Sequence, residues 1–357
     1  MVHHALASRT TARNVFVVLT DESGVEGWGE CCPRPYVTGE TVESAVQDIQ
    51  NIFIPALTDR SYDGWLEVCN RLDNIGRGVA RNQLAAFCAV ELAALDLAGK
   101  LYHTSAGQVI GEIQHQQVFY SGVIAAESLD DLEKQAHFMA RMKVRQVKIK
   151  TVADFEHNLN LLKAARSILG DAVELRIDAN CAWNSSEAVR QLERFRDFRL
   201  AGVEQPVPGD DLAGLREITA ADLVPVVVDE SLCSIQDAES LIQQNACHVF
   251  NVRVSKCGGL LNTRRIYQIA RDAGLECQLG AQVGESGILS AAGRHLATRL
   301  PDLKWLEGSY GSMLLENDIT EPDITVGVQG IASALDGNGM GVTPDRELVN
   351  RYLDHSI

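Results

Sequence analysis

The sequence predicts an α/β protein in which a closed (β/α)8-type barrel follows an α+β domain. From about residue 116 onward, short β-rich runs alternate with polar helical stretches, which is typical of parallel strands joined by crossover helices. Eight such runs are present, enough to close a barrel. No glycine-rich phosphate loop follows the first run, which argues against an open dinucleotide-binding sheet.

The first hundred residues have a different pattern. Residues 14–30 alternate apolar and polar positions around a Glu-Ser-Gly turn and predict a β-hairpin. Residues 41–100 are helical in pattern, with apolar residues at spacings of four and three between Leu84 and Leu95. Gly99 is expected to end the last of these helices. Together these elements predict an α+β opening domain.

Domain boundaries follow from the change of pattern. We expect the opening domain over residues 1–115, completed by a turn-rich tail, 315–357, that packs back on it, and the barrel over 116–314. One barrel helix is predicted over Phe155–Leu169, with Gly170 as its stop. The eight expected strands are 118–124, 147–151, 173–178, 202–206, 224–229, 248–254, 276–281 and 304–306.

Composition excludes several classes of partner. The net charge is −16 and no run of Lys and Arg occurs, which argues against nucleic acid or anionic membrane as a partner. No apolar stretch reaches the roughly 18 residues of a membrane span, and no signal peptide pattern opens the chain. The nine scattered cysteines indicate reduced thiols in the cytoplasm. An anionic small molecule would need local positive charge, from a metal or a few lysines.

Three expected strands end in a carboxylate: Asp178, Glu204 and Asp229. They are 26 and 25 residues apart, about one β/α unit each, so we expect all three at the same level of the barrel mouth. Taken singly, each acid could be a solvated strand end or a helix N-cap. Converging carboxylates repel unless a cation lies between them, and oxygen-only ligation suits Mg²⁺, with Mn²⁺ as an alternative.

Lys148 and Lys150 end the second strand, two residues apart, so both side chains point into the lumen. Two ammonium groups close to each other and to a divalent cation would lower each other's pKa. A lysine can then serve as a base. A solvated edge strand would also alternate lysines, but a central barrel strand has no such edge.

At these residues the chain resembles the enolase superfamily, and within it the mandelate racemase/muconate cycloisomerase-like, or muconate-lactonizing, subgroup. The likeness covers nearly the whole chain. It implies a modified TIM barrel, (β/α)7β, with an α+β capping domain. The motifs that carry it are KIK ending at Lys150, DAN from Asp178, EQP from Glu204, DES from Asp229, GWGE ending at Glu30 and LDLAGK ending at Lys100.

The resemblance implies roles for these residues. Asp178, Glu204 and Asp229 would bind Mg²⁺, and Lys150 would be the acid/base that faces a small-molecule carboxylate. Lys148 would tune it and stabilise the enediolate. A loop over residues 31–41 would close over the substrate. Relatives commonly form homo-oligomers, which we expect here too. Further binding residues would be Tyr36, Val37, Gln282 and Glu285, with Asn180 and Glu230 supporting the ligands.

The chain departs from the family pattern on strand six. The family usually has a second catalytic lysine 24 residues after the strand-five aspartate, where this chain has Arg253. Lys256 matches another lysine, three residues on. An odd offset predicts Arg253 in the lumen and Lys256 at the rim, if the strand stays regular. Glu285 could support either cation or be a helix N-terminal acid.

This departure bears on the reaction. Arginine is a poor base but a good fixed cation, so a single base, Lys150, favours cycloisomerisation or β-elimination (dehydration) by an isomerase or a lyase. A racemase or epimerase of an amino-acid or hydroxy-acid derivative, with Arg253 or Lys256 as second base, is the alternative. Dipeptide epimerases usually have D-x-D after strand eight, where this chain has Glu307-Gly308-Ser309. A non-catalytic ligand-binding barrel is a third, weaker possibility.

Overall fold

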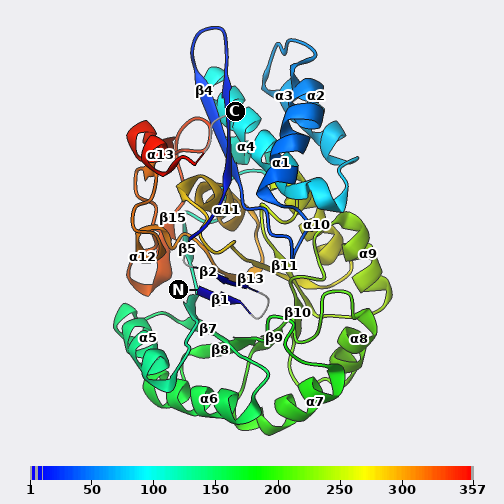
Figure 1. Cartoon of the computed structure of the whole chain (residues 1–357), viewed down its shortest axis with the longest axis vertical. Coiled ribbons are helices and arrows are strands. Elements are labelled where there is room, and N and C mark those ends of the chain that lie inside the picture. The colour runs from blue at the N-terminus through cyan, green and yellow to red at the C-terminus, as the bar shows by residue number, and fades with distance from the viewer. Residues whose placement is uncertain (1, 5–6, 10, 355–357) are drawn as a thin grey trace.

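The computed structural model describes residues 2–4, 7–9 and 11–354. A ring of parallel strands lies inside a ring of helices; the hairpin and helices of the opening region lie at one side of it, whereas residues 2–4 and 7–9 are drawn over the ring (Figure 1). The sheet has the order β6-β7-β8-β9-β10-β11-β12-β13, each strand next to its neighbour in the chain. Ser121 N, just before β6, donates to Leu306 O at the end of β13 across 2.7 Å, which links the two ends of the curled sheet. The predicted barrel fold is confirmed.

The barrel strands are short and buried. Their bounds are β6 Gly122–Ile124, β7 Gln146–Lys150, β8 Glu174–Asp178, β9 Gly202–Glu204, β10 Val226–Val228, β11 Val249–Val252, β12 Glu276–Leu279 and β13 Leu303–Leu306. The helices that follow are α5 Leu129–Met142, α6 Phe155–Leu169, α7 Ser185–Arg194, α8 Leu212–Ala220, α9 Ile235–Gln243, α10 Gly259–Asp272 and α11 Gly287–Arg299, with the short α12 Gly311–Leu314 after β13.

Helix α6 shows how local sequence sets these elements. Asp154 Oδ1 accepts from His157 N at 2.6 Å and caps the first turn, and Gly170 adopts a φ of +75° just after the last. The predicted bounds Phe155–Leu169 and the Gly170 stop are therefore confirmed.

The first expected strand, 118–124, is wrong as a single element. It is two strands, separated by Tyr120 and Ser121, which pair with different partners. β5 (Gln117–Phe119) pairs antiparallel with β15 (Ile331–Ser333) of the tail, and only β6 joins the barrel. Gly330, with φ +70°, lies against Tyr120, where a Cβ would be 2.1 Å from the carbonyl oxygen. The tail strand therefore holds the segment before the barrel.

The opening region contains the predicted hairpin, β3 (Val15–Thr20) with β4 (Glu26–Cys31), and its helices. Gly99 does not end the last helix, which continues to Leu101. A Cβ on Gly99 would be 2.7 Å from the Cα of Gly339, so this glycine serves close packing against the tail. The remaining elements here are β1 Val2–His4, β2 Ala7–Arg9, α1 Val42–Asp48, a π-helical turn Ile49–Phe53, α2 Ile54–Thr58, α3 Trp65–Gly76 and α4 Leu84–Leu101.

The tail contacts the hairpin and α4. Met340 N donates to Asp96 Oδ1 at 2.8 Å, and Arg346 contacts Glu26 of β4. Its elements are β14 Thr320–Glu321, β16 Thr343–Pro344 and α13 Arg346–Tyr352. The domain boundaries themselves stay a prediction.

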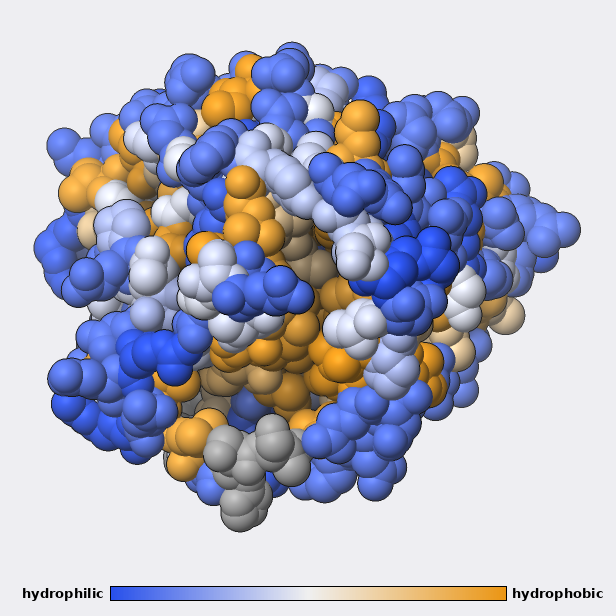
Figure 2. All heavy atoms as spheres, turned by 90° about the horizontal axis from the view of Figure 1, so that it is seen from above, coloured by the Kyte–Doolittle hydropathy of each residue, from blue (hydrophilic) through white to orange (hydrophobic). Residues whose placement is uncertain are grey.

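Seen from the side of the opening region, the surface is mostly hydrophilic, with a hollow whose walls are hydrophobic (Figure 2). Within the described residues, no helix combines the length and apolarity needed to cross a bilayer. All nine cysteines are described, and all are free thiols.

Candidate functional site

The carboxyl ends of neighbouring strands bring the three predicted carboxylates together. Asp178 ends β8, Glu204 ends β9 and Asp229 follows β10, and each is 1% exposed. Asp178 is in register with Glu204, but Glu204 is in register with Val227, two residues before Asp229. The expectation of a single level is therefore wrong, because barrel strands are staggered. The two-residue step keeps all three side chains on the same face.

Cationic side chains bridge the carboxylates. Lys148 Nζ lies 3.0 Å from Glu204 Oε2 and 3.6 Å from Asp178 Oδ2. Arg253 contacts Asp229 and lies 3.5 Å from Glu204 Oε1. Each adjacent pair of acids thus shares a cation, which relieves their mutual repulsion in this buried space.

The donor set fits a hard divalent cation. It offers only carboxylate oxygens, which Mg²⁺ prefers, and it is buried. Among the residues that the structure describes, however, no three His, Cys, Asp or Glu side chains surround a common point closely enough to hold a metal. The reason is visible in the contacts: Lys148 and Arg253 lie between the acids.

The pKa values of Glu204 and Asp229 shift in opposite directions. Burial raises the pKa of Glu204 to about 7, partly offset by Lys148 and reinforced by Asp178. Burial also raises the pKa of Asp229, but Arg253 and Lys256 outweigh it and hold this pKa well below its usual value. Asp229 is thus more firmly ionised than Glu204.

The two lysines of β7 differ in environment. Lys148 is 3% exposed, and burial lowers its pKa, but Glu204, Glu307 and Asp178 outweigh burial and raise the pKa above its ordinary value. The acids around Lys148 thus act against the lowering expected beside a divalent cation and Lys150, and that lowering stays a prediction. Lys150 is partly exposed at the mouth, and its Nζ donates to Asn180 Oδ1 at 2.9 Å. Asn180 Nδ2 also donates to Asp178 Oδ2 at 3.1 Å, so Asn180 links Lys150, the candidate base, to Asp178.

Lys256 is not at the rim. It is fully buried, and its Nζ donates to Asp229 O at 2.7 Å, Asp229 Oδ1 at 2.8 Å and Asn251 O at 2.9 Å. Strand alternation failed here because β11 ends at Val252 and the chain enters a turn. Arg253 extends toward the mouth, with its side chain 12% exposed.

Sequence reasoning missed four buried polar residues in the lumen. Gln278 Nε2 and Asn251 Nδ2 each donate to Glu204 at 2.9 Å. Glu307 Oε2 lies 2.6 Å from Lys148 Nζ, and Arg176 lies 3.1 Å from Glu307 Oε1. Arg176 and Asn251 could have been found by stepping back two residues from Asp178 and Arg253, since alternate residues share a face.

The predicted loop residues lie between the opening region and the barrel rim. Tyr36 and Val37 line a cavity of about 590 Å³ together with Glu230, which follows Asp229. Val37 is only 7% exposed and packs in a cluster with Leu84 and Cys233. The loop is fastened near its start, where Cys32 N donates to Ser255 Oγ at 3.0 Å.

Gln282 and Glu285 lie on the loop between β12 and α11. Arg253 Nη1 donates to Gln282 Oε1 at 3.4 Å. Glu285 accepts from Gln282 N at 3.0 Å and from Ser290 Oγ at 3.3 Å, and burial raises its pKa to about 8. Within the described residues no hydrogen bond or ion pair joins Glu285 to Lys256, and Glu285 instead holds the backbone of Gln282, whose side chain accepts from Arg253.

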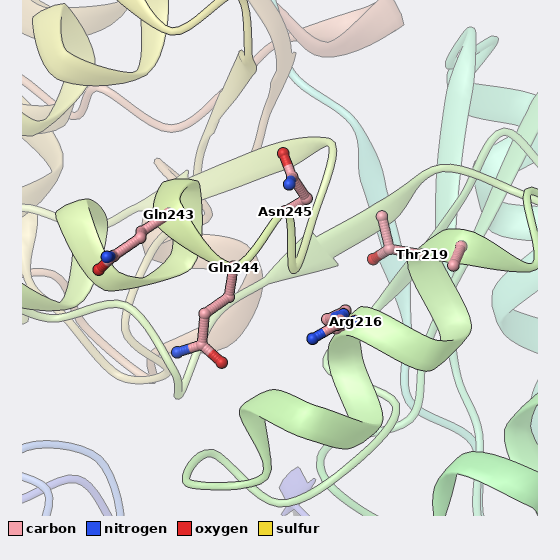
Figure 3. Close-up of a pocket in the computed structure, with 6 residues that line it drawn as sticks. Arg216, Thr219, Gln243, Gln244 and Asn245 are labelled. Atoms are coloured by element: carbon pink, nitrogen blue, oxygen red, sulfur yellow. The ribbon is translucent and has the colours of Figure 1, made fainter.

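A second cavity, of about 660 Å³, lies between the ends of α8 and α9 (Figure 3). Its lining includes Arg216, Thr219 and Gln244 but no carboxylate. Helices run antiparallel to the strands in a barrel, so the carboxyl ends of the helices lie at the face opposite the carboxyl ends of the strands. Barrel active sites are found at the carboxyl ends of the strands. This cavity is therefore not the candidate site.

Buried glutamates of the opening region begin two barrel helices. Glu91 of α4 accepts from Leu260 N and Leu261 N at the start of α10, and Glu30 of β4 accepts from Leu289 N at 3.1 Å at the start of α11. Burial raises the pKa of Glu30 to about 7 and that of Glu91 to about 8. These carboxyls join the opening region to the barrel.

We expect Glu91→Gln to reduce the loss of stability at rising pH. Because the folded-state pKa of Glu91 is raised from 4.5 to about 8, its contribution is fully present below pH 4.5 and is lost as pH rises through 8. Urea unfolding between pH 5 and 8 should show a steeper decline in the free energy of unfolding for the parent. The exposed Glu133→Gln is the control, and equal slopes for all three proteins would contradict the expectation.

Comparisons with known proteins agree with this geometry. A family profile described as enolase C-terminal domain-like matches residues 131–348. The profile of the mandelate racemase/muconate lactonizing enzyme N-terminal domain matches residues 1–111. Both halves of the chain are thus covered.

Individual relatives span most of the chain. A hydrophobic dipeptide epimerase of Enterococcus faecalis is 29% identical over 293 residues, 82% of this chain and 81% of that protein. Muconate cycloisomerase 1 of Rhodococcus opacus is 27% identical over 358 residues, 98% and 93% of the two. The crystal structure of dipeptide epimerase from Enterococcus faecalis V583, complexed with Mg and the dipeptide L-Leu-L-Tyr, superposes with a TM-score of 0.86 at 26% identity, covering 96% of this chain and 95% of that one.

Proposed function

The chain belongs to the enolase superfamily, in its muconate-lactonizing-like subgroup, and on that premise we propose that it removes the α-proton of a small-molecule carboxylate with one base, Lys150. The product would form by cycloisomerisation or β-elimination. The observation that carries this proposal is the difference between the lysines: Lys150 reaches the mouth, whereas Lys148 and Lys256 are buried among oxygen partners.

Asp178, Glu204 and Asp229 would hold Mg²⁺, or Mn²⁺ in its place. The metal would neutralise the substrate carboxylate and so make the neighbouring carbon more acidic. Oxygen-only donors support this assignment, as does the Mg in the structure of the related dipeptide epimerase. Arg253 and Lys148 would have to make room among the acids that they now bridge.

The remaining polar residues would orient the base and the substrate and stabilise the enediolate. Asn180 accepts a hydrogen bond from Lys150 and so directs the amine toward the mouth. Lys148 and Arg253, which remain charged, would stabilise the enediolate. Tyr36, Val37 and Gln282 are proposed to contact the distal part of the substrate, with Glu230 behind Asp229. A homo-oligomer in the cytoplasm, without nucleic acid or membrane as partner, remains our expectation.

One base is favoured over two by the contacts of Lys256. An ammonium has three N–H donors, and all three of Lys256 are engaged by oxygens at 2.7 to 2.9 Å. Its side chain has no exposed surface from which to reach a substrate. Arg253, which does extend toward the mouth, stays protonated near neutral pH.

Racemisation or epimerisation is the second candidate. The relatives support it at least as well, because the dipeptide epimerase matches most of this chain. It would need a base on each face of the α-carbon, and Arg253 or Lys256 would have to supply the second.

An exchange experiment separates the two candidates. Carboxylate libraries are incubated in D₂O with Mg²⁺, and α-deuterium incorporation is followed by mass spectrometry. With one base, a substrate with a stereocentre should exchange from one enantiomer only, without racemising. Arg253→Met should lower kcat by about 10² to 10³, the loss for one oxyanion-stabilising group. Equal exchange of both enantiomers by the parent would instead establish the two-base reaction. Lys256→Ala would then abolish α-proton exchange from one enantiomer only.

A further inference from the structure

Five buried side chains form a closed ring beneath the strand ends. Lys148 Nζ donates to Glu204 Oε2 at 3.0 Å, and Gln278 Nε2 donates to the same oxygen at 2.9 Å. Gln278 Oε1 accepts from Arg176 Nη1 at 2.6 Å. Arg176 Nη2 forms an ion pair with Glu307 Oε1 at 3.1 Å, and Glu307 Oε2 closes the ring 2.6 Å from Lys148 Nζ.

The ring is rigidly supported. Arg176 is 1% exposed, its guanidinium lies 4.5 Å from the ring centroid of Trp305, and its Nη2 also donates to Ser121 Oγ at 3.0 Å. Gln278 is fully buried. Arg176 comes two residues before Asp178 on β8, so it lies one layer deeper in the lumen than the acids at the mouth.

We propose that Arg176, Gln278 and Glu307 are positioning residues that fix Lys148 and Glu204 for the reaction. The inference rests on the proposed function, in which Glu204 is a metal ligand. A lysine has a flexible four-carbon stem, and the terminal torsion of a glutamate is broad, so neither holds one geometry unaided. Arg176 is the common support, because it contacts both Gln278, which orients Glu204, and Glu307, which orients Lys148.

Mg²⁺ titration by calorimetry on the full-length protein tests the proposal without any substrate. Arg176→Met should weaken Mg²⁺ binding by about 10- to 100-fold, the usual loss for a partner that orients a ligand. Arg176→Lys keeps a charge beside Glu307 but loses the planar guanidinium that contacts Gln278 and Glu307 together. Its Mg²⁺ affinity should fall between those of Arg176→Met and the parent. Gln278→Met, similar in size but without the amide, should weaken binding too.

A matched control separates positioning from general stability. Arg299 is another buried arginine, 5% exposed, but it lies at the end of α11 and donates to Gly111 O at 3.0 Å. Arg299→Met should lower Tm and leave Mg²⁺ affinity unchanged. If Arg176→Met does not fold, Gln278→Met decides the question.

The failures are distinguishable. Unchanged Mg²⁺ affinity in Gln278→Met and in folded Arg176→Met, together with loss of binding in Glu204→Gln, would overturn the positioning role alone. Unchanged affinity in Glu204→Gln as well would overturn the metal site on which the inference rests.

Discussion

Lys150→Ala should lower α-proton exchange by up to about 10⁴-fold, the upper range for loss of a general base. Lys150 is the lysine of the candidate site that is partly exposed at the mouth, and alanine leaves Asn180 without the N–H donor that it accepts from. Exchange is measured as α-deuterium incorporation in D₂O with Mg²⁺, on any carboxylate that the parent turns over.

The controls separate the base from its neighbours. Lys163→Ala removes an exposed lysine of α6 and should exchange at the parent rate. Lys148→Ala should retain a small residual rate, because it removes a stabilising cation and not the base. Exchange at the parent rate in Lys150→Ala would show that the base lies elsewhere.

Glu204→Gln should reduce Mg²⁺ binding by more than the roughly 10- to 100-fold that orienting partners contribute, because it removes a ligand charge. The substitution also turns an amide donor toward Gln278 and Asn251, which both donate to Glu204 now. Calorimetry measures the affinity, and the far-UV circular dichroism spectrum should stay native.

Glu193→Gln, at an exposed position of α7, is the matched control for this variant and should bind Mg²⁺ as the parent does. Parent-like affinity in Glu204→Gln would remove Glu204 from the ligand set, whatever the activity of the variant.

The strand ends could be predicted from the sequence because one rule governs them: parallel strands place their carboxyl ends on one face. Asp178, Glu204 and Asp229 converge as that rule requires. The stagger that offsets Asp229 could not be predicted, because it depends on how the sheet closes and not on any local pattern.

Predictions failed where the chain leaves regular structure or where packing partners are distant. Strand alternation predicts Lys256 at the rim, but the chain turns after Val252, and the turn directs Lys256 inward. Local sequence predicts Gly99 as a helix stop, because it does not show that Gly339, 240 residues later, packs against this glycine. Glu307, which lies 2.6 Å from Lys148 and raises its pKa, could not be paired with Lys148 from the sequence, because its place depends on how the ring of strands closes.

Glu91 and Glu30 have a consequence for modularity. Gly258 precedes α10 without any side chain to cap it, so the first N–H groups of that helix depend on the carboxyl group of Glu91 from α4. Leu289 of α11 likewise depends on Glu30. A barrel excised from its first hundred residues would begin two helices with unpaired donors in an apolar setting. The two parts of the chain are therefore not independent modules, because two helices of the barrel are completed only by acids of the other part.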